Sequence, residues 1–299
     1  MKKVVITGSN GLLGQSLVNL LLKEKESYKV YGFSRGENKS GREDFSYISI
    51  DITNKTQLHK KLTECNADVI INTAAMANVD ECEKNKQQCD NINVTAVKYL
   101  VDFCEETNAH LVHISTDFIF DGTKGYYAET DMPNPINYYG LSKLKSEKII
   151  EKSKIKYTIL RTILVYGNVH HMPRKNIVLW VKQSLKERKE VTIVNDQYRM
   201  PTYVENLALA CKIAIDKTHT GIYNISSNTL LSIYEIALQI AEVFNLDKSL
   251  IKPISTTTLN QIAPRPVKTG FDLSKTQNVL QLHVQSFKED LEIFKTTML

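Results

Sequence analysis

One stretch near the N-terminus decides the fold: VVITGSNGLLG, residues 4–14 of a 299-residue chain. Its first residues form a short apolar run, which predicts a buried strand, and glycines follow at every third position from Gly8 to Gly14. Apolar residues then recur with helical spacing from Leu17 to Leu22. A strand, a glycine turn and a helix in this order are typical of a site where helix amides receive a phosphate group.

The same alternation continues downstream. The apolar patterns predict strands at 30–33, 47–50, 69–71, 111–114, 157–160 and 221–225, and helices at 58–62, 94–104 and 139–150. Strands that alternate with helices favour a parallel sheet with right-handed crossovers. We therefore expect an α/β fold, a Rossmann-type doubly wound parallel sheet, followed by a smaller mixed α/β C-terminal substrate domain.

Composition and charge exclude several classes of protein. The chain is 42% hydrophobic with a formal charge of +5, and its lysines alternate with acids, as in 182–190, which indicates a solvated helix face. We expect no nucleic-acid partner. The N-terminus lacks a signal-peptide pattern, and no apolar run is long enough to span a membrane, so we expect a cytoplasmic protein without a membrane partner. Five cysteines without Cys-x-x-Cys spacing indicate reduced thiols, and we predict no metal site.

The glycine turn predicts a dinucleotide cofactor. Gly8, Gly11 and Gly14 allow the backbone to approach a pyrophosphate, and the amides of Leu12 and Leu13 would donate to it at the helix N-terminus. The alternative is a turn whose glycines serve packing only. On the cofactor interpretation, residues 1–166 form an NADP-binding domain completed by about 198–225, and 167–197 plus 226–299 form the substrate-binding domain.

Residues after the next strands specify which dinucleotide is expected. Ser34 and Arg35 stand where proteins that prefer NAD commonly place an acid, and a guanidinium suits a 2′-phosphate. We therefore predict NADPH, with NADH as the alternative. Asp51 would accept from the adenine amine while Ile52 covers the ring. The small residues Ala74 and Ala75 end the fourth strand, which leaves room for the cofactor.

Two further segments carry residues suited to catalysis. Ser115 and Thr116 end the strand predicted at 111–114, and Tyr139 and Lys143 lie one helical turn apart, on the same side of a helix. Of all the tyrosines in the chain, only Tyr139 has a lysine at this offset. A free phenol has a pKa of about 10, and a neighbouring cation lowers it, so Tyr139 is a candidate proton donor.

Together these motifs resemble an extended short-chain dehydrogenase/reductase, and most closely the dTDP-4-dehydrorhamnose reductase branch. The resemblance runs through nearly the whole chain, in the segments 72–83, 115–122, 139–147, 160–167, 195–202 and 265–266. It implies reduction of a nucleotide-linked 4-keto-6-deoxyhexose by NADPH, in dTDP-L-rhamnose formation. It also implies that Thr116, Tyr139 and Lys143 are catalytic, that Lys143 and Tyr139 also contact the cofactor, and that Asp117, Phe118 and Leu164 contact the substrate. A homodimer is compatible with the resemblance.

This chain departs from the branch at several positions. Phe118 stands where a tyrosine is usual, Leu164 where a tryptophan is common, and Arg199-Met200 replace two small residues. The loop at 170–173 is longer. Ser16 replaces an acid that in some members holds a metal between subunits, which supports the prediction of no metal.

Two other functions stay open. A nucleotide-sugar epimerase or dehydratase would use the same fold and the same Tyr139-Lys143 pair, but dehydratases carry an acid where this chain has Phe118, and epimerases tend to have an acid near position 35. The regulatory subunit of methionine adenosyltransferase also resembles this branch, as a binding protein. A complete set of Thr116, Tyr139 and Lys143 counts against that alternative.

Overall fold

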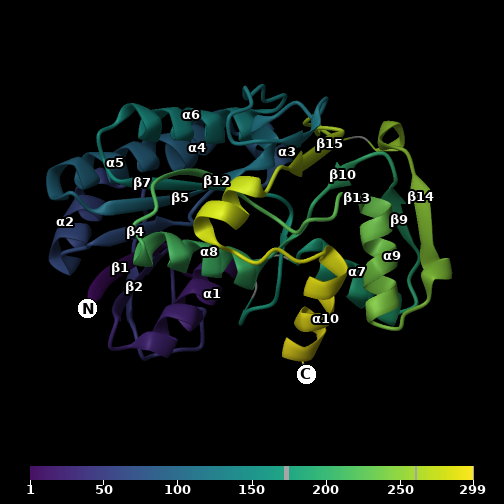
Figure 1. Cartoon of the computed structure of the whole chain (residues 1–299), viewed down its shortest axis with the longest axis horizontal. Helices are drawn as coiled ribbons and strands as arrows, with labels where there is room; N and C mark the ends of the chain where they lie inside the picture. Colours follow the sequence, from purple (N-terminus) through teal and green to yellow (C-terminus); the bar gives the residue numbers. More distant parts are fainter. Residues whose placement is uncertain (172–174, 260, 299) are drawn as a thin grey trace.

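The computed structural model describes residues 1–171, 175–259 and 261–298, and within them seven parallel strands form the central sheet (Figure 1). The strand order is β12-β7-β5-β4-β1-β2-β3. The strands are β1 (Lys2–Thr7), β2 (Tyr28–Ser34), β3 (Ser46–Ser49), β4 (Val69–Asn72), β5 (His110–Thr116), β7 (Tyr157–Thr162) and β12 (Gly221–Ile225). All neighbouring pairs run parallel, as the alternation of strands and helices predicted.

Helices cover both faces of this sheet, which confirms the doubly wound fold. In Figure 1, α5 (Ala96–Thr107) and α6 (Tyr138–Lys152) lie above the strands, and α1 (Leu12–Leu21) and α8 (Val204–Asp216) lie below them. The helix α2 (Lys55–Cys65) packs beside α5. Because both faces are covered, strand residues such as those at 4–6 are fully buried, which explains their continuous apolar run.

The strand order creates a crevice at one edge of the sheet. From β1 the chain moves outward through β2 and β3, and it then returns to the other side of β1 to form β4. At such a reversal the connections after the two neighbouring strands diverge, which leaves a crevice outside their carboxyl ends. The glycine turn follows β1 and Ala74 follows β4, so the predicted cofactor residues meet at this place.

A second, mixed sheet lies beyond these carboxyl ends. Within the described residues it has the order β13-β10-β15-β6, and β10 pairs antiparallel with β13. Its strands are β13 (Leu231–Ser232), β10 (Tyr198–Arg199), β15 (Lys268–Phe271) and β6 (Gly125–Tyr127). We expected β6 and β10 in the first domain, but they leave the central sheet because both belong to long excursions from its carboxyl edge. The division of the chain into domains therefore stays a prediction, with these two strands reassigned.

The remaining elements have the following bounds. They are α3 (Val79–Lys84), α4 (Lys86–Asp90), η2 (Asn91–Thr95), η3 (Asp117–Ile119), β8 (Val165–Tyr166), α7 (Ile177–Lys186), β9 (Val191–Val194), β11 (Thr202–Tyr203), α9 (Ile233–Val243), β14 (Ile251–Ile254) and α10 (Phe287–Thr297). Short helical turns lie at η1 (Leu22–Glu24), η4 (Lys248–Leu250), η5 (Thr256–Thr258) and η6 (Thr276–Leu280). In the longer loop at 170–173, positions 172 and 173 lie outside the described residues.

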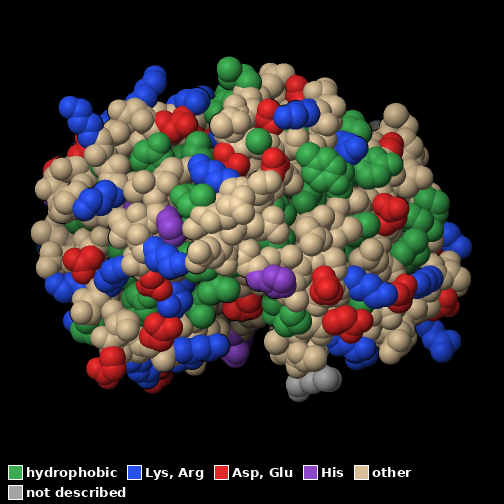
Figure 2. All heavy atoms as spheres, viewed as in Figure 1, with side chains coloured by type: hydrophobic (Ala, Val, Ile, Leu, Met, Phe, Trp, Pro, Cys, Tyr) green, Lys and Arg blue, Asp and Glu red, His purple; other side chains and the backbone are tan. Residues whose placement is uncertain are grey.

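Surface and cysteine features agree with the composition. Figure 2 shows lysine and arginine side chains interspersed with acids over one face of the molecule. All five cysteines are buried and free. Among the helices that the structure describes, none has the length and apolar character needed to cross a membrane.

Candidate active site

A cleft of about 760 Å³ lies at the crevice between β1 and β4. Eight of the predicted cofactor residues line it, namely Gly8, Gly11, Ser34, Arg35, Asp51, Ile52, Ala74 and Ala75. They come from loops after four different strands, which the parallel topology brings to one edge. The cleft also contains residues that the motifs did not indicate, among them Asn10, Lys39, Thr53, Thr73 and Met76.

The glycine turn is shaped for close approach of the backbone. Gly8 has φ +71°, and a side-chain carbon there would lie 2.8 Å from the amide nitrogen of Ala74. Gly11 caps α1 without a side-chain hydrogen bond, which leaves the first amides of the helix to other acceptors. The side chains of Leu12 and Leu13 do not line the cleft, because they pack in or against the hydrophobic core. Only the backbone amides of these two residues, in the first turn of α1, stay candidates for binding a phosphate.

Two cations line this cleft. Arg35 and Lys39 are both exposed and both line it. Asn10 organises their loop, because its Nδ2 donates to the Glu37 carbonyl at 2.8 Å and its Oδ1 accepts from the Lys39 amide at 2.9 Å. A second cation four residues after Arg35 was visible in the sequence, but no strand or helix pattern placed it beside Arg35.

The carboxylate of Asp51, after β3, also lines the cleft. It accepts from the Thr53 amide at 2.9 Å and from the Thr53 hydroxyl at 2.8 Å. The hydrogen bond from the Thr53 amide and the charge of Arg35 lower the pKa of Asp51, so this side chain is an anion at neutral pH. Ile52 is buried beside it, as a ring-covering side chain would be.

The helix α6 is built to meet the end of β5. Its N-cap, Asn137, accepts from the Gly140 amide at 2.9 Å. A side-chain carbon at Gly140 would lie 2.0 Å from the Phe118 carbonyl oxygen, so only glycine lets the helix approach η3 this closely. The rings of Phe118 and Tyr139 consequently meet edge to face, with centroids 6.0 Å apart.

Burial changes the acid-base properties of Tyr139 and Lys143. The pKa of Tyr139 is raised by burial, against a smaller lowering by its hydrogen bond with Thr116. This direction is opposite to the one we expected from Lys143. The Lys143 amine lies instead 3.0 Å from Nε2 of His113, and only 3% of Lys143 is exposed. Burial lowers the pKa of Lys143 to about 8, although Glu147 opposes the change.

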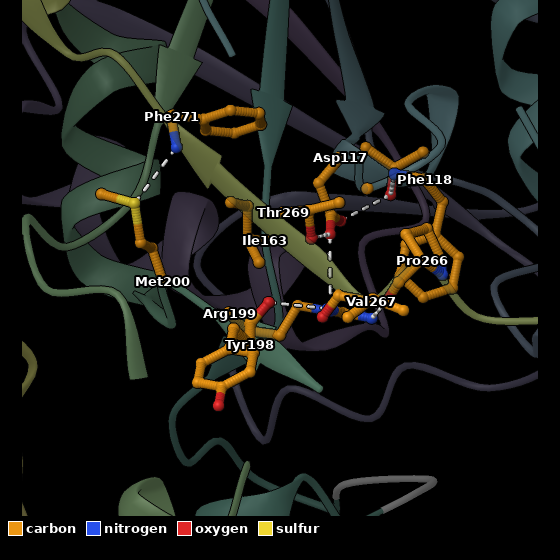
Figure 3. A network of polar contacts seen from close by, with 12 residues as sticks. Asp117, Phe118, Ile163, Tyr198, Arg199, Met200, Pro266, Val267, Thr269 and Phe271 are labelled. Atoms are coloured by element: carbon orange, nitrogen blue, oxygen red, sulfur yellow. Dashed lines mark hydrogen bonds and ion pairs between the residues drawn. The ribbon is translucent and has the colours of Figure 1, made fainter. Parts of the chain in front are cut away.

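Asp117 belongs to a buried network of polar contacts with residues of β10 and β15 (Figure 3). The Thr116 hydroxyl donates to Asp117 Oδ1 at 3.1 Å, and Oδ2 accepts from the Thr269 hydroxyl. Arg199 Nε lies 3.7 Å from the same Oδ2. Burial raises the pKa of Asp117, and the charge of Arg199 opposes this. We predicted Asp117 as a substrate contact, but the structure directs its carboxylate to protein groups, because β15 and β10 close over it.

Arg199 joins this network to the segment 264–267. Its guanidinium donates to the Pro266 carbonyl at 2.7 Å and the Tyr198 carbonyl at 2.6 Å, and it lies 5.5 Å from the centre of the Phe118 ring. In the sequence, Arg199 stands out only as a large residue where the family usually has a small one. Its role depends on β10 pairing with β15, a contact between residues far apart in sequence.

A second arginine anchors the same segment to α3. Arg265 makes a bidentate ion pair with Asp80, with nitrogen-oxygen distances of 2.6 and 2.8 Å.

The other residues predicted near the substrate lie close to this network. Phe118 and Leu164 are partly buried, and Leu164 has φ +41°. Ser115 is buried with no hydrogen-bond partner for its hydroxyl among the described residues. Thr116 is the hydroxyl that hydrogen-bonds with Tyr139.

Comparison with known proteins agrees with this geometry. The family model described as the RmlD substrate binding domain matches residues 1–298. The chain belongs to this family. A dTDP-4-dehydrorhamnose reductase of Aggregatibacter actinomycetemcomitans is 31% identical, and the match covers 98% of each chain.

Other proteins to which this chain is similar have different functions in their names. The crystal structure of dTDP-4-dehydrorhamnose reductase from Bacillus anthracis str. Ames in complex with NADP has a TM-score of 0.88 and 32% identity, covering 99% of this chain and 100% of that one. Methionine adenosyltransferase 2 subunit beta of Bos taurus is 28% identical over 93% of this chain and 82% of its own length. The expected family and fold class are confirmed.

The metal prediction concerns Ser16, which stands where some RmlD family members hold an acid. Its hydroxyl donates to Glu205 Oε1 at 3.0 Å, inside the interface between α1 and α8. Within the described ranges, no three His, Cys, Asp or Glu side chains are grouped as metal ligands. The absence of a metal stays a prediction.

Proposed function

We propose that the protein uses NADPH to reduce the 4-keto group of a nucleotide-linked 6-deoxyhexose, as in dTDP-L-rhamnose formation. One observation carries this proposal. A cleft lined by Arg35 and Lys39 opens at the carboxyl edge of the parallel sheet. Thr116 ends β5 at the same edge, and α6, which packs on β5, carries Tyr139 and Lys143; these three residues lie outside the lining of the cleft. The RmlD relatives that are reductases support the same assignment.

The residues of the cleft fit NADPH. The amides after Gly11 would hold the pyrophosphate, and Ile52 would cover the adenine. Arg35 and Lys39 would hold the 2′-phosphate, since a guanidinium and an ammonium both match its charge. A side chain at Gly8 would collide with Thr73 and Ala74, so glycine keeps the turn packed against the segment after β4. When bound, the cofactor supplies a hydride for the ketone carbon.

The proton comes from the protein in this proposal. Tyr139 gives its phenolic proton to the ketone oxygen as negative charge develops there. Thr116 stabilises that charge by turning its hydroxyl from Asp117 to the same oxygen. Lys143 in its charged form would favour the phenolate that Tyr139 becomes, and it would hold the nicotinamide ribose. Proton transfer thus requires Lys143 to be protonated in the complex, although burial alone disfavours its charge.

The sugar end of the site is assigned by position. Phe118 and Leu164 would contact the deoxyhexose through apolar surface, where the family commonly places a tyrosine and a tryptophan. Arg199 supports Phe118 from behind, and its donors are committed to protein carbonyls. A less polar pocket favours a sugar that presents its methyl group to Phe118 and Leu164.

The test compares two adjacent tyrosines. Tyr139→Phe should lower NADPH oxidation with a 4-keto nucleotide sugar by about 10²- to 10⁴-fold and leave NADPH affinity nearly unchanged, because it removes only a proton donor. Tyr138→Phe is the matched control, since the Tyr138 hydroxyl bonds to Asp90 outside the site. Wild-type protein is first screened with several 4-keto nucleotide sugars by NADPH absorbance. Retention of most turnover in Tyr139→Phe would remove Tyr139 from its role.

A regulatory binding protein is the second candidate, and the similarity to methionine adenosyltransferase 2 subunit beta favours it. Such a protein would bind NADPH and a partner enzyme without oxidising the cofactor in the presence of any nucleotide sugar in the screen. An epimerase is less well supported, because Arg35 and Lys39 favour NADPH over NAD. A cytoplasmic location and a homodimer remain predictions.

A further inference from the structure

His113 is a fully buried histidine that the proposed mechanism does not use. It lies on β5, three residues before Thr116, with no exposed surface. Its Nε2 is 3.0 Å from Lys143 Nζ and 3.1 Å from Ser146 Oγ. Its Nδ1 is 3.0 Å from Asn72 Nδ2. The ring therefore links the catalytic helix to the end of β4.

The hydrogen bonds around the ring determine which nitrogen carries its proton. Thr7 donates to Asn72 Oδ1 at 2.6 Å and can accept from the Ala74 amide at 3.4 Å. With its oxygen facing Thr7, the Asn72 amide turns its nitrogen to the ring and donates to Nδ1. A neutral imidazole that accepts at Nδ1 carries its hydrogen on Nε2.

This Nε2–H faces the Lys143 amine and the Ser146 hydroxyl. Ser146 gives its own hydrogen to the Lys143 carbonyl at 2.7 Å, so its oxygen can accept. An ammonium has no lone pair and would meet the Nε2–H donor to donor, whereas an uncharged amine can accept from it. A charged Lys143 can donate to the ring only if the ring changes tautomer and the Asn72 amide turns over, which leaves the Thr7 hydroxyl without this acceptor.

We propose that His113 is a positioning residue that holds Lys143 and, through its Nε2–H, favours the uncharged form of the lysine. The chain from Thr7 through Asn72 then couples the charge of Lys143 to the strand that precedes the glycine turn. The consequence for turnover rests on the proposed function, in which Lys143 acts as a cation beside Tyr139.

The other charged and titratable groups around Lys143 are an ion pair, two cysteines and an aspartate. Glu147, one turn away on α6, is bound to Arg161 of β7 by two hydrogen bonds of 2.7 and 3.1 Å. The remaining titratable side chains near the pair Tyr139 and Lys143 are Cys82 of α3, Cys89 of α4 and Asp117 of η3. The pKa of His113 is held well below its usual range by burial and by Lys143, so the ring stays neutral while Lys143 titrates.

The experiment observes Lys143 directly. Protein labelled with ¹³C and ¹⁵N at lysine is titrated by NMR, and the Lys143 Cε and Nζ signals are assigned by their loss in Lys143→Arg. We expect a midpoint near a pKa of about 8 in the wild type. His113→Asn places its amide near the Nδ1 position and keeps a partner for Asn72, but it cannot reach Lys143, so the midpoint should rise by about one pH unit or more.

A second substitution and a control make the test specific. The longer side chain of His113→Gln reaches the Nε2 position, and its carbonyl can accept from an ammonium, so the midpoint should rise further. His110→Asn is the control, because that buried histidine of β5 contacts Thr158 and should leave the midpoint unchanged. Either His113 variant is sufficient if the other does not fold. An unchanged or lowered midpoint in the folded variant overturns the proposal.

This outcome is separate from that of the proposed function. The titration needs neither cofactor nor sugar, so an inactive protein can still show the shift. If turnover with a 4-keto nucleotide sugar is found, the midpoint of its alkaline limb should move upward in His113→Asn by the same amount as the NMR midpoint. A merely structural role of His113 would lower turnover without moving either midpoint.

Discussion

Replacement of Arg35 by alanine should weaken NADPH binding far more than NADH binding. Arg35 is exposed and lines the cleft, and its charge adds to the hydrogen bond from the Thr53 amide in lowering the pKa of Asp51. The two cofactors differ only in the 2′-phosphate, so the comparison isolates the contact between that phosphate and the guanidinium. Lys39 remains as a second cation in the variant, which should retain part of the attraction.

The expected loss of NADPH affinity depends on how exposed Arg35 is to solvent. A hydrogen bond to a charged group contributes about 1.5–3 kcal/mol, and solvent screening at this exposed site favours the lower end. About 1.4 kcal/mol corresponds to a tenfold change in Kd. We therefore expect Arg35→Ala to raise the Kd for NADPH by roughly 10- to 30-fold and the Kd for NADH by less than about 3-fold.

The assay is a fluorescence titration of each reduced cofactor at two salt concentrations. Arg42→Ala is the matched control: Arg42 lies on the same excursion after β2, but its guanidinium is engaged by Asp44 at 2.6 and 2.9 Å and does not line the cleft. The Arg35 effect should shrink at high salt because the contact is electrostatic. Equal weakening of NADPH and NADH, or an equal effect in Arg42→Ala, would refute the assignment of Arg35 to the 2′-phosphate.

Two further predictions concern stability. Glu147→Gln removes the carboxylate that pairs with the buried Arg161, so it should lower the free energy of unfolding, measured in urea, by about 3–5 kcal/mol. The double variant Glu147→Leu with Arg161→Met removes both charges and should recover most of this loss. No recovery in the double variant would contradict the explanation. Burial raises the pKa of Asp290 to about 6, so the folded state binds the proton of this carboxyl group more tightly than the unfolded state does. The contribution of Asp290 to the free energy of unfolding is therefore fully present below about pH 4 and is lost as the pH rises through 6. Asp290→Asn should remove about 3 kcal/mol of that decline between pH 4 and 7.5, and an unchanged decline would contradict it.

The elements of the central sheet were predictable because their signals are local. A strand buried on both faces reads as an apolar run, and the turn after β1 needs glycine at position 8 for its φ of +71°. The second sheet was not predictable in the same way. Its strands β10 and β13 are two residues long, too short for any periodicity, and they are strands only because distant segments pair with them.

The residues of the candidate site were also predictable only where the signal in the sequence is local. Tyr139 and Lys143 share a helix face by spacing alone, and Arg35 follows a strand that the sequence shows. The partner of Lys143 was not visible, because His113 looks like an ordinary strand residue until α6 packs on β5. Asp117 was assigned to the substrate, although Thr269, more than 150 positions later, binds its carboxylate inside the protein.

The sequence therefore indicates the glycine turn, the alternation of strands and helices along the chain, and the three side chains proposed as catalytic, since each signal depends on neighbours within a few residues. Charge and hydrogen-bond direction at those side chains come from packing. Burial raises the pKa of Tyr139 and lowers that of Lys143, and contacts between β4, β5 and α6 determine which proton faces the lysine. Such effects depend on the loss of water and on atoms about 3 Å apart, and these distances exist only after the sheet and helices have assembled.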